Sequence, residues 1–303
     1  MARQRKGLPV NGWLILDKPQ GLNSTRAVGR VKHLFNAQKA GHAGTLDPLA
    51  TGVLPIALGE ATKTVPFVMD GSKAYRFTIV WGAETDTDDA EGSVTERRET
   101  RPSRDEIEAI LPRFTGTISQ TPPRYSALKV DGARAYDLAR ENEEFELQPR
   151  DVTIDCLSLV EMPDPDHAVL EAECGKGTYV RALARDIGRG LGVLGHVGAL
   201  RRTRVGPFDE ATAIPLATLE TLEPEGLSGT LLPVEMALAE IPSLNLSSSD
   251  AARLRTGQSV LLRGRDAPIH SGPIYALSRG ALVAIGEVSQ GEFKPKRIFN
   301  LTR

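Results

Sequence analysis

The first residues that could do chemistry lie in a glycine-rich stretch, residues 41–52, which contains Asp47 and His42. No long apolar run and no helical repeat passes through it, so a turn is predicted there. Pro48 keeps the backbone of Asp47 out of the helical region, and such a stiff turn suits a carboxylate that must be aimed. Taken alone, a cluster of Gly, Asp and Pro is more typical of a polar surface turn, so other segments must decide between the two interpretations.

The composition is that of an ordinary globular protein. The chain has 303 residues, of which 40% are hydrophobic and 25% charged, and this length favours two domains. No apolar run approaches the roughly 20 residues needed to span a bilayer, and the basic residues 1–6 lack the apolar region of a signal peptide. Cys156 and Cys174 suit neither a disulfide framework nor a zinc site. We expect both to be buried thiols in a cytoplasmic protein.

The charge is unevenly distributed, although the net charge is only −2. Residues 84–99 contain seven acids and two arginines, whereas residues 243–303 contain nine Lys or Arg against four Asp or Glu. Arg201, Arg202 and Arg204 fall within four positions. Localised basic charge permits a nucleic-acid-binding face on a nearly neutral protein, but charge alone fits a solvated surface equally well.

Several elements would position these residues. Residues 73–81 read as a strand on which Tyr75 shares one face with other apolar residues. Thr178 is expected to cap a helix of about 179–189, with Arg181, Arg185 and Arg189 as candidates for its outer face. Further strands are expected at 12–17, 53–58, 115–119, 152–160, 167–174 and 197–205, and helices at about 25–36 and 104–111, the latter opened by a capping box of Ser103 and Glu106.

Two motifs are rejected as ligand sites. Asp86, Asp88 and Asp89 lack the glycine and distal glutamate of an EF-hand, so residues 84–92 are expected to form a solvated loop. Residues 190–195 match G-x-G-x-x-G, but they follow a helix where a dinucleotide fingerprint needs a preceding strand.

Two further segments suit RNA contact. Residues 121–151 form a long insertion between two strands, and a loop of such length is usually functional or disordered. It combines basic and aromatic side chains, which are Arg124, Tyr125, Lys129, Arg134, Tyr136 and Arg140. This composition favours a flap that grips RNA or another substrate over a plain exposed hairpin. Residues 240–303 alternate short strands, at 260–263, 274–277, 282–287 and 297–301, with one helix near 248–255, which predicts a small basic β-module.

Seven segments together resemble the bacterial tRNA pseudouridine synthase B family. They span about residues 12–208 in the family's order and spacing, and they are residues 16–21, 41–52, 85–88, 123–129, 175–181 and 198–208, with Tyr75 on its strand. Ala43 departs from the polar residue usual at its position. The resemblance implies a mixed α/β (α+β) fold with a mainly antiparallel sheet and flanking helices, a catalytic domain over 1–239 with a thumb-like insertion at about 121–151, and a PUA-like β-barrel over 240–303.

The resemblance also implies a function, the isomerisation of uridine to pseudouridine at position 55 in the T-loop of tRNA. Asp47 would be the catalytic carboxylate, Arg181 its partner, and Tyr75 the residue that stacks on the target base. Asp47 would attack the ribose or the base, or remove a sugar proton after the base departs; the sequence leaves these open.

Further roles follow from the same resemblance. His42 would fill the space left by a flipped base, Tyr179 and Leu200 would line the base pocket, and Lys18 would support the floor of the site. Arg201 and Arg202 would contact RNA. Neither a cofactor nor a metal is implied, and the expected partner is tRNA alone, bound by a cytoplasmic monomer.

Two other classes of protein are alternatives to this interpretation. A non-catalytic tRNA-binding or folding chaperone on the same scaffold would not need Asp47, Tyr75 and Arg181 together. A glycoside hydrolase would need a second well-placed carboxylate, and none lies near the motifs.

Overall fold

One long mixed sheet organises the larger part of the molecule. The structure is a computed structural model that describes residues 7–126, 128–130, 133–141, 143, 145–262 and 272–301. Within these residues ten strands form one sheet, in the order β14-β1-β3-β12-β4-β11-β10-β7, with β2 beside β3 and β13 beside β12. Only the β1–β14 and β3–β12 pairs are parallel, so the predicted mainly antiparallel mixed sheet is confirmed. The strands of this sheet are β1 Gly12–Lys18, β2 Ala40–His42, β3 Thr51–Leu58, β4 Lys73–Trp81, β7 Gly116–Gln120, β10 Arg150–Asp164, β11 His167–Cys174, β12 Gly195–Val205, β13 Phe208–Asp209 and β14 Ile214–Pro215.

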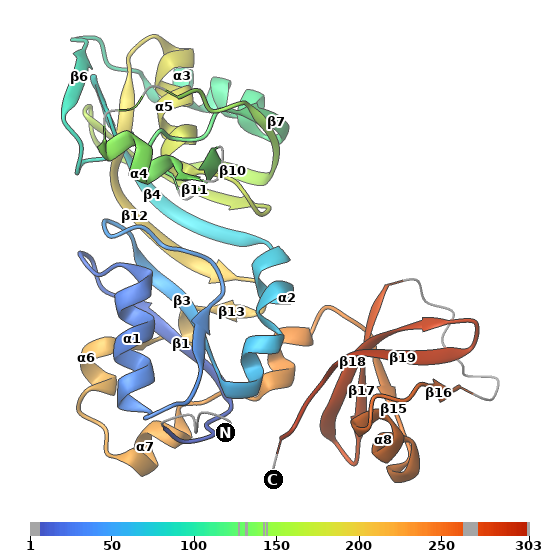
Figure 1. Cartoon of the computed structure of the whole chain (residues 1–303). Coiled ribbons are helices and arrows are strands. Elements are labelled where there is room, and N and C mark those ends of the chain that lie inside the picture. The colour runs from blue at the N-terminus through green and yellow to red at the C-terminus, as the bar shows by residue number, and fades with distance from the viewer. Residues whose placement is uncertain are drawn as a thin grey trace.

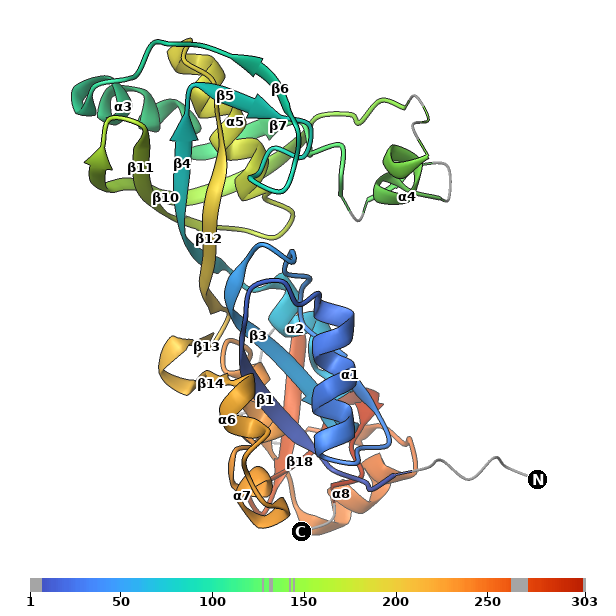
Figure 2. The same cartoon turned by 90° about the vertical axis from the view of Figure 1, so that its left-hand side faces the viewer.

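Strands β4 and β12 connect the two halves of this sheet (Figures 1 and 2). They pair antiparallel from Gly195–Trp81 at one end to Val205–Lys73 at the other. The alternation of Phe77, Ile79 and Trp81 buries one face of β4, as a half-buried strand requires. One pocket is lined by residues of both strands, so residues far apart in sequence meet there.

Helices cover the sheet in both halves. Helix α1 (Ser24–Leu34) packs on β2 and β3, and α5 (Val180–Leu191) packs on β12 with α3 (Arg104–Ile110) beside it. The capping box of Ser103 and Glu106 opens α3 as predicted. The other helical elements are η1 Gly59–Lys63, α2 Val65–Asp70, η2 Leu111–Phe114, α4 Ala135–Arg140, η3 Glu210–Thr212, α6 Leu216–Leu219, α7 Pro224–Gly229 and η4 Val234–Leu238. Among the described residues, no helix is long and apolar enough to cross a membrane.

Two small hairpins stand apart from the main sheet. Strand β5 (Ala83–Thr85) pairs with β6 (Val94–Arg97), and β8 (Lys129–Val130) pairs with β9 (Ala133–Arg134). The second hairpin and α4 belong to the insertion, which projects from the body in Figure 2. The side chains predicted to grip RNA at Lys129, Arg134, Tyr136 and Arg140 lie outside the description, as do the basic residues 1–6.

A second, curled sheet forms a module at the end of the chain, as predicted (Figure 1). Its strands lie in the order β15-β17-β18-β19-β16, with α8 (Ser248–Arg255) packed against them and a core of its own that includes Leu254, Val283 and Phe293. The strands are β15 Ser243–Asn245, β16 Val260–Leu261, β17 Pro273–Ser278, β18 Ala281–Ser289 and β19 Glu292–Ile298. The last strand therefore begins at residue 292, not at residue 297 as expected.

The module is docked on the larger sheet by its final residues. Phe299 is buried in a cluster that also contains Trp13 and Phe208 of the larger part. Lys63 Nζ donates to the Ile298 carbonyl over 2.7 Å and stacks above the Phe299 ring at 5.5 Å. Apolar burial and these polar contacts hold the module against η1.

Two local expectations are wrong. Cys156 lies on β10 and is exposed. Cys174 lies on β11 and is buried, as expected. Thr178 does not cap α5: Tyr179 is the N-cap residue, and the Thr178 hydroxyl donates to the Gly175 carbonyl over 3.2 Å. The Thr178 hydroxyl is therefore bound within the Gly175–Thr178 turn and forms no cap hydrogen bond with α5.

Candidate active site

A pocket of about 320 Å³ lies where the turn of residues 44–47 meets β4, β12 and the start of α5. It unites the predicted residues Asp47, Tyr75, Tyr179, Arg181 and Leu200. The other lining residues are Gly44, Thr45, Leu46, Met69, Lys73, Ser126, Gly175, Lys176, Gly177, Thr178, Val180 and Arg202. The surface-turn interpretation of residues 41–52 is therefore wrong, because Ala43, Leu46 and Leu49 are buried in the core.

The Asp47 turn is fixed from beneath by Lys18 and Ser24. The ammonium group of Lys18 is fully buried and donates to the carbonyls of Leu22 and Pro48, at 2.7 and 3.4 Å. Ser24 Oγ accepts from the Leu46 amide at 2.8 Å and donates to its carbonyl at 2.9 Å. Burial lowers the pKa of Lys18 to about 8, since it disfavours the ammonium more than the nearby Asp47 carboxylate stabilises it. Lys18 therefore lies beneath the turn that carries Asp47 and does not reach the protein surface.

Arg202 also fixes the turn that carries Asp47. It is 1% exposed, and its guanidinium donates to the carbonyls of Val53, Thr45 and Gly44 at 2.9, 3.1 and 3.1 Å. The prediction that Arg202 contacts RNA is corrected, because the side chain is almost fully buried and three of its N–H groups bind these backbone carbonyls.

Arg201 lies outside the pocket that contains Asp47. Its side chain, 37% exposed, forms a two-pronged ion pair with Asp17 at 3.0 and 3.1 Å and contacts Glu210. Much of its charge is therefore balanced within the protein, so its expected RNA contact stays a prediction.

Asp47 and Arg181 form the central ion pair of the site. Arg181 Nε lies 2.9 Å from Asp47 Oδ2, and the side chains are 7% and 37% exposed, respectively. The Arg181 guanidinium also donates to the carbonyls of Thr87 and Tyr125, both at 2.8 Å, and lies 3.4 Å from Asp89 Oδ2. A guanidinium stays charged when buried, so Asp47 has a permanent cation beside it. The expected place of Arg181 on an outer helix face is wrong, because the acidic loop covers that face.

Three carboxylates of the acidic loop are buried against α5, whereas Asp86 and Glu91 remain exposed. Glu84, Asp88 and Asp89 are each less than 9% exposed, and their partners are Arg189, Arg185 and Arg181 on α5. The expected solvated loop is therefore wrong. Arginines at successive helical turns share one face of α5, and this face binds the acids of the loop.

Two tyrosines and a leucine enclose the space beside Asp47. Tyr75 comes from β4, Leu200 from the neighbouring strand β12, and Tyr179 from the start of α5. Burial raises the pKa of both Tyr75 and Tyr179, so both rings are neutral at physiological pH. Flat neutral rings and an apolar side chain beside an ion pair suit a planar polar ligand such as a nucleobase.

Gln120 is a positioning residue that the sequence did not reveal. It is buried at the end of β7, and its side-chain amide donates to the Tyr179 carbonyl at 3.2 Å and accepts from the Tyr179 amide at 2.9 Å. This double contact fixes Tyr179 at the start of α5. Glutamine has no motif signal at this position, because only the fold brings β7 beside α5.

His42 lies on β2, two residues before the pocket-lining Gly44. Its Nδ1 atom is buried, and burial lowers the pKa of the ring, so His42 is neutral at pH 7. A neutral, partly buried ring can stack on a base without the cost of desolvating a charge.

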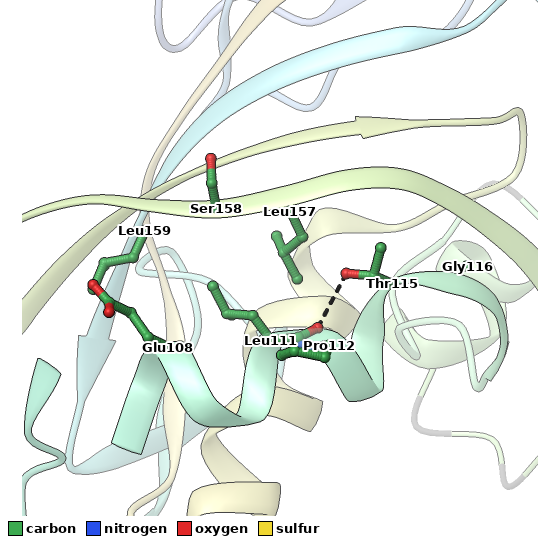
Figure 3. Close-up of a pocket in the computed structure, with 8 residues that line it drawn as sticks. All are labelled: Glu108, Leu111, Pro112, Thr115, Gly116, Leu157, Ser158 and Leu159. Carbon is green, nitrogen blue, oxygen red and sulfur yellow. Dashed lines mark hydrogen bonds between the residues drawn. The ribbon is translucent and has the colours of Figure 1, made fainter. Parts of the chain in front are cut away.

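A larger hollow elsewhere carries no comparable chemistry. It lies between η2 and β10 and is lined mainly by Leu111, Pro112, Leu157 and Leu159, with Glu108 at its edge (Figure 3). Within the described residues, no group of three His, Cys, Asp or Glu side chains is placed to hold a metal ion. The ion-paired pocket at Asp47 is therefore the candidate active site.

The sequence matches known proteins along most of its length. Residues 32–180 match the profile described as "TruB family pseudouridylate synthase (N terminal domain)", and residues 181–239 match that described as "tRNA pseudouridylate synthase B C-terminal domain". The fold and these matches define a pseudouridylate synthase. More specifically, the chain belongs to the TruB family of these enzymes.

Named relatives and a solved structure support the same family and fold. A protein named tRNA pseudouridine synthase B from Bradyrhizobium diazoefficiens is 62% identical over 99% of this chain and 91% of its own length. A protein of the same name from Agrobacterium fabrum is 55% identical over 98% of this chain and 97% of its own. The fold is similar to that in a crystal structure of a Cbf5-Nop10-Gar1 complex, with 25% identity, a TM-score of 0.71, and coverage of 95% of this chain and 84% of that one.

Proposed function

We propose that this enzyme isomerises uridine to pseudouridine at position 55 in the T-loop of tRNA, with Asp47 as the essential carboxylate. One observation carries the proposal: Asp47, partly exposed, is paired at 2.9 Å with the buried Arg181 in a pocket walled by Tyr75, Tyr179 and Leu200. The relatives named tRNA pseudouridine synthase B support tRNA as the substrate.

The reaction breaks the bond between ribose C1′ and uracil N1, turns the base and joins C1′ to C5. C5 then loses its proton and N1 gains one, so the composition of the nucleotide is unchanged. Asp47 acts as the carboxylate in this sequence, by attack on ribose or base or by removal of a sugar proton. Its charge is needed in each case, and Arg181 stabilises it. Tyr75 stacks on the base while the base turns.

The target uridine must leave the stacked loop before it can reach Asp47. The pocket of about 320 Å³ receives the flipped base, and Leu200 and Tyr179 contact its faces or edges. His42, neutral and next to the pocket-lining turn, stacks in the space that the base leaves.

Two other parts of the chain contact the RNA outside this pocket. The insertion of residues 121–151 and the module of residues 240–303 form the thumb and a PUA-like domain beside a catalytic domain of residues 1–239. Residues 243–303 carry nine basic side chains against four acidic ones, which suits a phosphate backbone.

The test is pseudouridine mapping on an unmodified tRNA transcript. The wild-type enzyme should convert uridine 55 and no other uridine of the T-arm, and a transcript with cytidine at that position should gain no pseudouridine. Modification at another position would refute the site. Tight binding without any pseudouridine would instead support the non-catalytic chaperone.

A further inference from the structure

A second arginine–aspartate pair lies one helical turn beyond the Asp47–Arg181 pair. Arg185 is four residues after Arg181 on α5, so the two side chains share one face of the helix. Arg185 Nη1 lies 2.9 Å from Asp88 Oδ2, and both side chains are about nine-tenths buried. This pair does not line the pocket that receives the base.

Arg185 links α5 to two other parts of the chain. Its Nη2 donates to the Thr121 carbonyl at 2.8 Å, its Nη1 to Asp88, and its Nε to Asp186 at 2.8 Å. Thr121 directly follows β7 and begins the insertion. The planar guanidinium serves these acceptors in three directions at once, which an ammonium group cannot reproduce with the same geometry.

Asp88 is held in an uncommon backbone conformation that aims it at Arg185. Its φ is +61°, in the left-handed region that few residues other than glycine adopt. Its amide donates to the Thr85 carbonyl at 3.1 Å, and its carbonyl accepts from the Val197 amide at 3.1 Å. The loop is thus tied to β12 while the carboxylate points to α5.

Both arginines bind the same two segments. Arg181 donates to Thr87 and Tyr125, whereas Arg185 donates to Asp88 and Thr121. Residues 121–126 are therefore held at two points along one helix face. The segment ends at Ser126, which lines the pocket, so its position shapes the pocket wall and the partners of Arg181.

We propose that Arg185 and Asp88 are positioning residues for the reaction: they fix residues 121–126 against α5 and so hold Arg181 where it pairs with Asp47. This inference rests on the proposed function for its catalytic consequence. A buried ion pair is weak evidence for stability in itself, because an apolar pair is often as stable. The position of the pair between loop, helix and insertion instead indicates a geometric role.

The test compares Arg185→Lys and Asp88→Asn with the matched control Arg189→Gln. Arg189 lies on the same helix face and pairs with Glu84 of the same loop, at 2.7 Å, but its side chain is more than half exposed. The described contacts of Arg189 do not include residues 121–126. The control therefore separates loop anchoring in general from the specific link to the insertion.

Single-turnover pseudouridine formation is measured with a saturating T-arm RNA, together with the RNA dissociation constant. We expect Arg185→Lys to slow the reaction about tenfold to a hundredfold, since small displacements of reacting groups cost that much. Asp88→Asn, which keeps the size of the side chain, should slow it about threefold to tenfold. Affinity should stay within about threefold in both, and Arg189→Gln should react at the wild-type rate within about twofold.

Hydrogen exchange gives a readout independent of activity. The backbone amides of Thr121, Arg124, Tyr125 and Ser126 are the ones to follow, because Pro122 and Pro123 carry no amide hydrogen. They should exchange about tenfold faster in Arg185→Lys and remain at wild-type rates in Arg189→Gln. Unchanged exchange and rate in folded Arg185→Lys and Asp88→Asn would overturn the proposal, and so would equal slowing in the control. An inactive wild-type enzyme would refute the proposed function instead, while exchange would still test the link.

Discussion

Replacement of Arg181 separates the structural from the chemical role of the central ion pair. Arg181→Met keeps most of the buried stem and removes the charge. It leaves Asp89, whose side chain is 5% exposed, without its cationic neighbour. Loss of one partner from a buried pair costs about 3–5 kcal/mol. Asp89 also accepts from Thr87 Oγ1 at 2.6 Å and from the Glu91 amide at 3.0 Å, so the lower end, about 3 kcal/mol, applies.

The catalytic loss has a different origin and should be separable from this destabilisation. Asp47 is 37% exposed, so water replaces part of the lost contact and little folding energy is at stake there. Its orientation and local field, however, depend on Arg181. We expect the single-turnover rate to fall at least about a hundredfold, the loss typical when one preorganised charged contact is removed.

A double variant distinguishes the stabilising role of Arg181 from its role beside Asp47. Arg181→Met with Asp89→Asn removes the unpaired buried charge, so urea denaturation should show a recovery of about 2 kcal/mol relative to the single variant. The rate should remain as low as in the single variant. Recovery of the rate along with stability would show that Arg181 acts only by supporting the fold, and would refute its role beside Asp47.

Three further changes test other parts of the structure. Because burial lowers the pKa of Lys18 to about 8, the folded chain binds that proton less tightly than the unfolded chain does. The free energy of unfolding should therefore rise by roughly 2–3 kcal/mol between about pH 8 and pH 10.5. Urea denaturation of Lys18→Met should lack this rise. His42→Ala should slow the single-turnover reaction about tenfold, while the midpoint of thermal unfolding moves by less than about 3 °C. Since burial lowers the pKa of His42, the ratio of wild-type to variant rates should not change between about pH 7 and pH 8. A pH-dependent ratio would contradict the neutral stacking role. Phe299→Ala should cost about 3–5 kcal/mol at the docked module, seen as faster proteolysis between the two sheets, and an unchanged cleavage pattern would contradict the docking.

The sequence predicted the elements whose signals are local. Strands Lys73–Trp81 and His167–Cys174 appear at the predicted bounds because apolar alternation specifies a half-buried strand directly. Helix α3 follows its capping box for the same reason. The pairing of Asp47 with Arg181 came from the family resemblance, since 134 residues separate the two and no local rule joins them.

The errors at the site concern charged groups whose partners are distant in sequence. A cluster of acids and a row of arginines each suggest solvent when read alone. In the fold, β5 and the turn after it lie against α5, so Asp88 and Arg185 neutralise each other away from water. Arg202 is a similar case, because its donors are used by carbonyls of the turn around Gly44. Burial of charge depends on tertiary pairing, which periodicity does not encode.

Asp47→Asn tests the central claim most directly. Asparagine has nearly the same shape but no charge, so the pocket and the contacts of Arg181 with Thr87 and Tyr125 should persist. With a T-arm RNA, the variant should form no detectable pseudouridine at position 55, while RNA affinity stays within about tenfold of the wild type. Pseudouridine formation by the folded variant at a rate near that of the wild type would contradict the account.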